Sequence, residues 1–300
     1  AMSLKHGGHL SHGHKVSFTS KTYKFVQYGV DLETNLLDYE EIGKLARIFK
    51  PKVIVCGATA YPRKIDFQKF SDIAKEVGAY LVADISHIAG LVATGLHSSP
   101  VGIADVVMTT THKTLRGPRG AMILCRKDLA DKIDKAVFPG LQGGPHENVI
   151  AAIAICLDEA HDSKFKAYIK QVLANAKQLA NTLIDNDIDI ITGSTDNHLV
   201  LVDLSKHKVG GADIEKILED CGIIVNKNMI PGDTRKPLDP SGLRLGTPAV
   251  TTRGMKESEM QLLAELISQV VKALDDDIVL KRVKSEVQKL TQKFPIIQME

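Results

Sequence analysis

The sequence predicts an α/β fold with a largely parallel sheet covered on both faces. Four short apolar segments have the length and composition of buried strands, at residues 53–56, 80–83, 105–108 and 121–125. Residues 65–77 carry apolar side chains at helical spacing and stop at Gly78. Short apolar strands that alternate with helices are typical of sheets with helices packed on both sides.

The pattern changes after Pro145. We expect helix over residues 147–186 with a break near Asp162, then strands at 188–191, 198–204, 223–225 and 243–245, a helix at 211–220, and helix from Lys256 to the end. The sequence therefore predicts two domains. Residues 1–162 form a large domain with a bridging helix, and residues 163–300 form a small α+β domain.

Composition narrows the class of protein. The chain is 44% hydrophobic and 25% charged with a formal net charge of +2, so charge gives no reason to expect binding to nucleic acid or membrane. No apolar run approaches the roughly 20 residues that span a bilayer, and no signal peptide is recognised. The four cysteines form no C-x-x-C pair, which favours reduced thiols in a cytoplasmic protein.

Lys113 is the sharpest chemical signal. It follows the third predicted strand and precedes the loop Arg116-Gly117-Pro118-Arg119-Gly120. Ligands of α/β folds lie beyond the carboxyl ends of strands, and a desolvated lysine amine attacks carbonyl carbons. A solvated loop lysine is the alternative interpretation.

Asp84 and His87 follow the second predicted strand. A carboxylate there suits the pyridine nitrogen of pyridoxal 5′-phosphate (PLP), and a flat side chain suits its ring. A helix N-cap is an equally good interpretation of Asp84 by itself. The presence of Lys113 in the same predicted sheet favours the cofactor.

Three weaker motifs complete the pattern. The N-terminal His6-Gly7-Gly8-His9 allows close backbone approach to a ligand, and we expect no metal there because no cysteine or acidic ligand accompanies it. Gly143 and Gly144 precede a helix whose start suits an anion, or form an ordinary loop. Arg244 lies in an apolar, glycine-flanked segment and suits a carboxylate ligand or a structural salt bridge.

Together these segments resemble the serine hydroxymethyltransferase family from residue 3 to about residue 280. The run T-T-T-H-K-T-L-R-G-P-R-G is highly specific to it, and H-G-G-H-L-S-H-G, A-D-I-S-H-I-A-G-L-V, F-P-G-L-Q-G-G-P, T-D-N-H-L and V-N-K-N also match. The resemblance implies an aspartate-aminotransferase-like fold, the fold type I of PLP enzymes, and a homodimer or a dimer of dimers.

The resemblance also implies roles for individual residues. Lys113 would form the Schiff base with PLP, Asp84 would hold the pyridine nitrogen, and His9 would stack on the ring. The other implied cofactor or catalytic positions are His87, Thr59, His112, Thr110, and Gly143 and Gly144, which would reach the phosphate bound by a neighbouring subunit. Arg244 would bind the substrate carboxylate, and the implied tetrahydrofolate site comprises Leu4, Gly8, His9, Leu10 and Asn228.

The implied reaction is the interconversion of serine plus tetrahydrofolate with glycine plus 5,10-methylenetetrahydrofolate, in one-carbon metabolism and glycine biosynthesis. The family pattern includes a segment before the His-Gly-Gly-His motif that carries a phosphate loop, tyrosines and a proton-handling glutamate. That segment is not in this sequence, so we expect the 300 residues alone to have impaired activity. The alternatives are a folate-independent β-hydroxy amino acid aldolase and a non-catalytic fragment.

Overall fold

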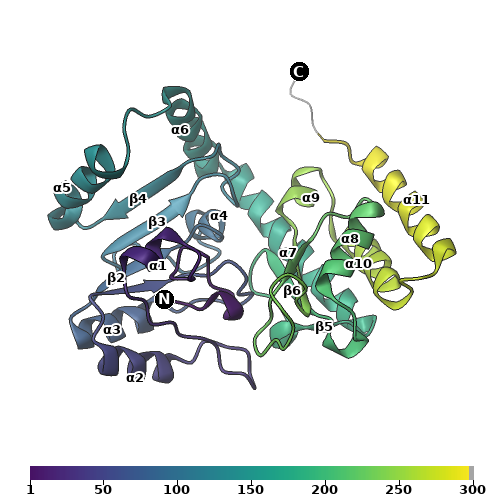
Figure 1. Cartoon of the computed structure of the whole chain (residues 1–300). Coiled ribbons are helices and arrows are strands. Elements are labelled where there is room, and N and C mark those ends of the chain that lie inside the picture. The colour runs from purple at the N-terminus through teal and green to yellow at the C-terminus, as the bar shows by residue number, and fades with distance from the viewer. Residues whose placement is uncertain (297–300) are drawn as a thin grey trace.

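Two sheets organise the chain, which the computed structural model describes over residues 1–296 (Figure 1). The first sheet has the order β1-β2-β3-β4, with β1 to β3 parallel and β4 antiparallel to β3. Its strands are β1 (Val53–Cys56), β2 (Tyr80–Asp84), β3 (Val106–Thr110) and β4 (Ala121–Cys125). All four predicted strands are therefore confirmed, and the third is displaced by one to two residues.

Two helices of this half, α2 (Tyr39–Phe49) and α3 (Phe67–Val77), begin at an aspartate that caps the helix. Asp66 accepts hydrogen bonds from the Gln68 and Lys69 amides at the start of α3, and Gly78 ends the helix with φ 69°. Asp38 caps α2 in the same way. The helices are α1 (Phe18–Thr22), α2 (Tyr39–Phe49), α3 (Phe67–Val77), α4 (Ala89–Ala93) and α5 (Lys127–Lys135).

The expectation of a sheet covered on both faces is wrong at β4. Ile123 and Leu124 are each 47% exposed, whereas Leu81 and Ala83 in β2 are fully buried. These side chains are exposed because β4 lies at the edge of the sheet. No strand within residues 1–296 pairs with its outer side.

A helix break at Asp162 separates α6 (Glu147–His161) from α7 (Ser163–Asp185), as predicted. The Asp162 side chain accepts a hydrogen bond from the Lys164 amide and so begins α7. The helix α7 runs between the two sheets (Figure 1). Its first half packs Phe165 and Ile169 into the core of the first sheet, and its second half packs Leu179 and Leu183 into the core of the second.

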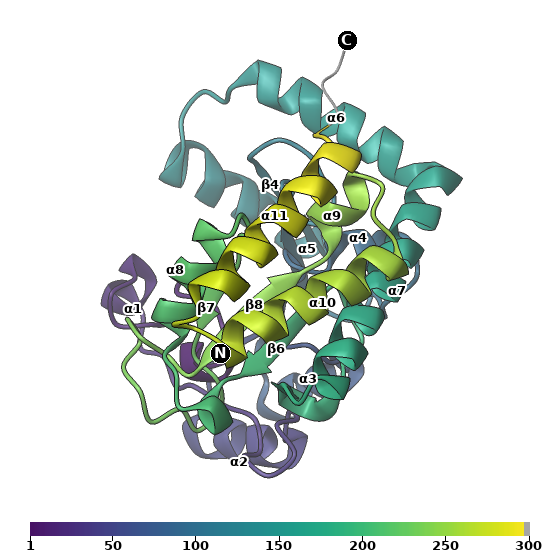
Figure 2. The ribbon, with the colours of Figure 1, turned by 90° about the vertical axis from the view of Figure 1, so that its right-hand side faces the viewer.

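The second sheet is entirely antiparallel, with the order β5-β6-β8-β7. Figure 2 shows α10 and α11 in front of it. The strands are β5 (Asp189–Ile190), β6 (Leu199–Asp203), β7 (Asn226–Asn228) and β8 (Gly242–Gly246), and the helices are α8 (Gly211–Asp220), α9 (Pro248–Thr252), α10 (Glu257–Lys272) and α11 (Asp277–Lys293). The division between the two apolar cores falls within α7, after residue 163. A domain boundary between residues 162 and 163 therefore remains a proposal.

Three predictions for this half need correction. The strand expected at residues 223–225 is wrong, because the Ile223 amide donates to Leu218 O at the end of α8 and pairing begins only at Asn226. The strand at residues 188–191 shortens to two residues. The final helix is two helices, since Asp276 caps a new one, and residues 297–300 lie outside the described part of the chain.

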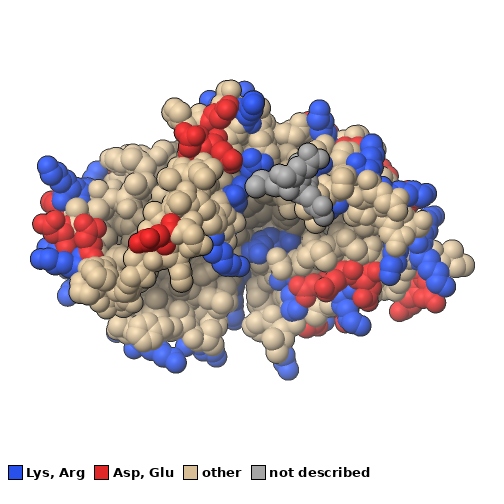
Figure 3. Space-filling view, turned by 90° about the horizontal axis from the view of Figure 1, so that it is seen from above, with Lys and Arg blue, Asp and Glu red and all other residues tan. Residues whose placement is uncertain are grey.

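The surface between the two halves is hollowed when it is seen from above, and lysine or arginine side chains lie within that hollow (Figure 3). Within residues 1–296, no helix combines the length and the apolar character needed to cross a membrane.

Gly57 illustrates how closely the strand ends approach each other. Its φ is 129°, and a Cβ at this position would lie 2.2 Å from Asp84 O at the end of β2. We expect Gly57→Ala to lower the free energy of unfolding by about 3 kcal/mol, because backbone strain and overpacking add. Chemical denaturation measures this change.

Gly78→Ala is the matched control. Gly78 also has a positive φ, of 69°, but nothing lies within 4 Å of the added Cβ. It should lose only the strain contribution, about 1 kcal/mol. Equal losses at the two glycines would show that the close approach to Asp84 carries no cost.

Candidate functional site

The carboxyl ends of the parallel strands bring the predicted residues to one edge of the sheet. Thr59 follows β1, Asp84 ends β2, and Lys113 follows β3. Neighbouring parallel strands end at the same edge, which is why residues so distant in sequence meet. The N-terminal motif joins them, because Gly7 O accepts hydrogen bonds from the amides of Thr59 (2.8 Å) and Ala60 (3.0 Å).

Asp84 is a partly buried carboxylate with two fixed partners. His12 Nε2 lies 3.0 Å from Asp84 Oδ2, and the Ser86 amide donates to Oδ1 at 2.9 Å. Burial raises the pKa of Asp84, but the hydrogen bonds from His12 and Ser86 outweigh it and lower the pKa to about 2. Asp84 is not a helix N-cap, because α4 begins only at Ala89. It is an ionised acceptor near Lys113.

Lys113 lies half-buried beside this carboxylate. Burial lowers the pKa of its amine, Asp84 opposes that effect, and the positive charges of Arg244 and Arg119 reinforce it. Within residues 1–296, no hydrogen bond or ion pair engages Lys113 Nζ. A lowered pKa increases the fraction of free amine, which is the nucleophilic form.

Three histidines surround the lysine and the carboxylate. His87 stacks on His198 with ring centroids 5.9 Å apart and an interplanar angle of 17°. Burial lowers the pKa of His198 to about 4 and that of His87 to about 2, with nearby cations adding to the effect. Burial also lowers the pKa of His9, with further contributions from His12 and Lys113. Flat, neutral rings therefore line the site at neutral pH.

Arg244 reaches the same place from β8 of the second sheet. Its Nη1 donates to Thr59 O at 3.4 Å, and its Nη2 donates to Asn226 Oδ1 at 3.1 Å. Burial lowers the pKa of this guanidinium. No carboxylate within residues 1–296 forms an ion pair with it, so the structural salt bridge considered above is absent from the described chain. The charge of the guanidinium is therefore not neutralised by a carboxylate of the described residues, which suits an anionic ligand.

Unpaired buried atoms indicate that the site suits a polar ligand. Such atoms are usually hydrogen-bonded in folded proteins. Five buried side-chain atoms in the described chain have no partner, and four belong to residues at or beside this edge: His12 Nδ1, Thr110 Oγ1, His112 Nδ1 and His198 Nδ1. Together with an ionised carboxylate, an unpaired lysine amine and a guanidinium that has no carboxylate partner within residues 1–296, these donors and acceptors fit PLP and an amino acid. No group of three or more metal-ligating side chains is found within residues 1–296.

Several predicted residues lie apart from this cluster. Gly143 and Gly144 lie in the exposed segment before α6, with open space around them. Leu4 begins a short 3-10 helix, and Leu10 is 46% exposed on the turn that follows. Gly8 is buried where a Cβ would meet Met2 O at 2.1 Å, and Asn228 in β7 bonds to Met229 O. Their cofactor and folate roles remain proposals.

Two residues with no role predicted from the sequence contact predicted site residues. His12 holds Asp84, and His198 stacks on His87. Both lie in motifs that resemble the family pattern, H-G-G-H-L-S-H-G and T-D-N-H-L. Their spacing in the sequence gave no sign of these partners, because the contacts are made across the fold.

Comparison with known proteins places the chain in a family. Residues 1–267 match the family model described as serine hydroxymethyltransferase. The chain is 52% identical over 296 residues to a protein named serine hydroxymethyltransferase from Methanospirillum hungatei JF-1, and the match covers 99% of this chain and 72% of that protein. The motifs, the fold and the cluster around Lys113 agree with this match, and the chain belongs to the serine hydroxymethyltransferase family.

Proposed function

We propose that the cluster around Lys113 is the site of the family's reaction in this chain. The family uses PLP and interconverts serine plus tetrahydrofolate with glycine plus 5,10-methylenetetrahydrofolate. The observation that carries the proposal is that Lys113 lies near both Asp84 and Arg244, while neither cation has an ion-pair partner within residues 1–296. An enzyme that binds an amino acid through PLP needs an amine that attacks the cofactor aldehyde and a cation that pairs with the substrate carboxylate.

Each residue has a distinct task in this proposal. When bound, PLP supplies an electron-withdrawing ring that stabilises negative charge at the amino-acid Cα. Asp84 remains ionised down to a pH of about 2 and would hold the proton of the pyridine nitrogen. His12 fixes the direction of that carboxylate, while His9 and His87 would contact the ring from its two sides.

Arg244 would bind the α-carboxylate of serine through two parallel hydrogen bonds. This contact would fix the rotation of the substrate about the bond between its amino nitrogen and its Cα. The fixed rotation would select which bond to Cα breaks. Lys113 would hold the cofactor and release it to the substrate amine. Thr59, Thr110 and His112 would complete the cofactor contacts, and Leu4, Gly8, Leu10 and Asn228 would receive tetrahydrofolate.

We also propose that the protein forms a homodimer or a dimer of dimers in the cytoplasm. Apolar side chains are exposed on the segment from η2 (Ala136–Leu141) to α6, with Phe138 60%, Leu141 84% and Ile155 62% exposed. Exposed apolar groups of this kind mark subunit contacts. A second copy against this segment would bring Gly143 and Gly144 to its cofactor phosphate. The four free cysteines support a reducing compartment.

Labelling of Lys113 tests the proposed site. The protein is loaded with PLP, reduced with borohydride and digested. We expect the cofactor on the peptide that contains Lys113, and no covalent label after Lys113→Ala. Lys64→Ala, at an exposed lysine near the same edge, should label normally. Attachment to any other lysine would contradict the assignment.

Substitution of Arg244 tests the substrate contact. Arg244→Ala should weaken serine binding by about 2 kcal/mol or more, roughly 30-fold, because a charge-assisted contact is lost. PLP affinity should stay within about threefold, since its proposed contacts lie elsewhere. Serine titration followed by the absorbance of the cofactor measures both quantities.

Arg253→Ala is the control for that experiment. Arg253 is also partly buried, but its guanidinium bonds the main-chain oxygens of Thr291 and Phe294, away from the site. It should leave serine affinity unchanged. Equal serine affinities for the Arg244 variant and the parent protein would show that Arg244 does not bind the substrate.

A further inference from the structure

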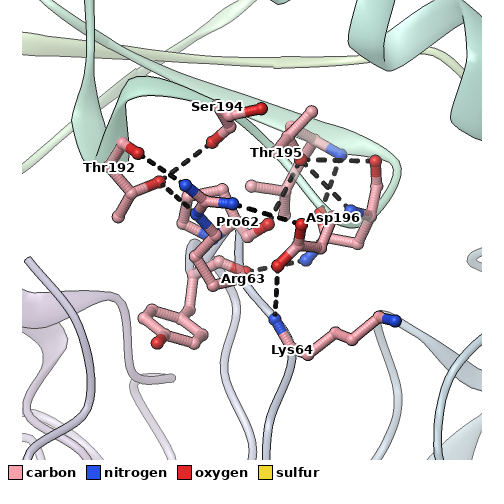
Figure 4. A network of polar contacts seen from close by, with 10 residues as sticks. Pro62, Arg63, Lys64, Thr192, Ser194, Thr195 and Asp196 are labelled. Carbon is pink, nitrogen blue, oxygen red and sulfur yellow. Dashed lines mark hydrogen bonds and ion pairs between the residues drawn. The ribbon is translucent and has the colours of Figure 1, made fainter.

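A network of polar contacts joins the loop after β1 to the segment before β6 (Figure 4). The loop, residues 57–66, carries Thr59 and runs to α3. The segment, residues 191–198, ends in His198. The two stretches are more than 120 residues apart in sequence, and the network joins the first half of the chain to the second.

Hydrogen bonds to the backbone oxygens of the loop set the register of the two stretches. The Asp196 amide donates to Pro62 O at 2.8 Å, and Thr195 Oγ1 donates to the same oxygen at 3.2 Å. Asn197 Nδ2 donates to Tyr61 O at 2.9 Å and is buried. Because three consecutive residues of the segment bond to two consecutive residues of the loop, the segment cannot slide along the loop without losing all of these hydrogen bonds.

The Arg63 guanidinium closes the network with three contacts. Its Nε donates to Thr192 Oγ1 at 3.1 Å, its Nη2 donates to Thr192 O at 2.8 Å, and its Nη1 lies 3.2 Å from Asp196 Oδ1. Figure 4 shows the guanidinium between Thr192 and Asp196. The Lys64 amide adds a bond to Asp196 Oδ2 at 3.3 Å. One planar group thus binds both ends of the turn formed by residues 192–196.

Thr192 adopts a conformation that its side chain disfavours. Its φ is 67°, in the left-handed region, where a β-branched residue is an outlier. Such a conformation persists only where surrounding contacts hold it. Two of the three contacts of Arg63 go to Thr192 itself, to its hydroxyl and its carbonyl. Arg63 therefore holds a strained residue in place.

The turn leads directly to the proposed substrate site. His198, two residues after Asp196, stacks on His87. The strand β6 follows at Leu199, and its Leu201 pairs with Arg244 in β8. Arg244 also contacts Thr59 O in the loop that carries Arg63. A shift of the turn would move Arg244 and His198 together relative to the loop and to Lys113.

We propose that Arg63 is a positioning residue for the substrate carboxylate contact. By holding Thr192 in its left-handed conformation and pairing with Asp196, it fixes the distance between Arg244 and the cofactor residues of the first sheet. The inference rests on the proposed role of Arg244. The Arg63–Asp196 pair is about 30% exposed, so its effect on global stability is small and its effect on geometry is what an experiment detects.

The first test is substrate binding by the PLP-loaded protein. Arg63→Gln should weaken serine binding about tenfold and raise the serine KM to match, while kcat changes less than about threefold, since the cofactor residues are untouched. Arg47→Gln is the control, because Arg47 forms an exposed ion pair with Glu76 away from the site. Serine affinity within twofold of the parent protein would overturn the proposal, whatever happens to the melting temperature.

The second test is rescue by relief of strain. Glycine adopts a positive φ without cost, so Thr192→Gly lets the turn keep its shape without Arg63. The double variant Arg63→Gln/Thr192→Gly should recover most of the tenfold loss. A double variant that binds serine no better than Arg63→Gln would overturn the proposal, because an ordinary salt bridge would not be replaced in this way. If Arg63→Gln does not fold, Arg63→Lys is measured by the same two tests.

The third test needs no cofactor. Hydrogen exchange of the Asp196 amide reports its bond to Pro62 O. Exchange should accelerate at least tenfold in cofactor-free Arg63→Gln and return toward the parent rate in the double variant. Unchanged exchange overturns the proposal. If exchange accelerates while Arg244→Ala leaves serine affinity unchanged, then the contact holds the turn but the proposed function of Arg244 is wrong, so the two failures are distinguishable.

Discussion

The hydrogen bond between His12 and the buried carboxylate of Asp84 is the contact on which the site depends. A carboxylate at the end of a buried strand is costly unless it is satisfied, and burial by itself would raise its pKa. His12, supplied by the N-terminal motif, and the Ser86 amide reverse that effect and hold the pKa at about 2. The result is a fixed negative charge at an edge otherwise lined by cations and neutral rings.

The surrounding groups are tuned by the same burial. Desolvation lowers the pKa of a histidine or a lysine, and the nearby charges of Lys113 and Arg244 add to the effect on His198. His87 and His198 consequently remain neutral flat surfaces, and Lys113 loses part of its preference for the protonated amine. The negative charge of Asp84 raises the pKa of Lys113 and so offsets part of the lowering that burial causes.

The two halves of the chain contribute different residues to the candidate site. The first sheet supplies Asp84 and Lys113 from its strand ends, whereas the second supplies Arg244 and His198. The helix α7 packs into both cores and sets the approximate separation of the sheets. The contacts between residues 61–64 and 192–197 then fix the local alignment. In this fold, apolar packing thus sets the approximate distance between the two sheets, and hydrogen bonds set their local alignment.

The sequence by itself determined the strands of the first sheet, the helix break at Asp162 and the residue types at the strand ends, because apolar periodicity and capping act over a few residues. It failed at residues 223–225, where apolar residues follow a helix but bond back to it. Only the tertiary structure decided that His12 bonds to Asp84, that His198 stacks on His87 and that Arg63 holds Thr192. Those contacts join residues 72 to 129 positions apart, and local sequence patterns carry no information about such pairs.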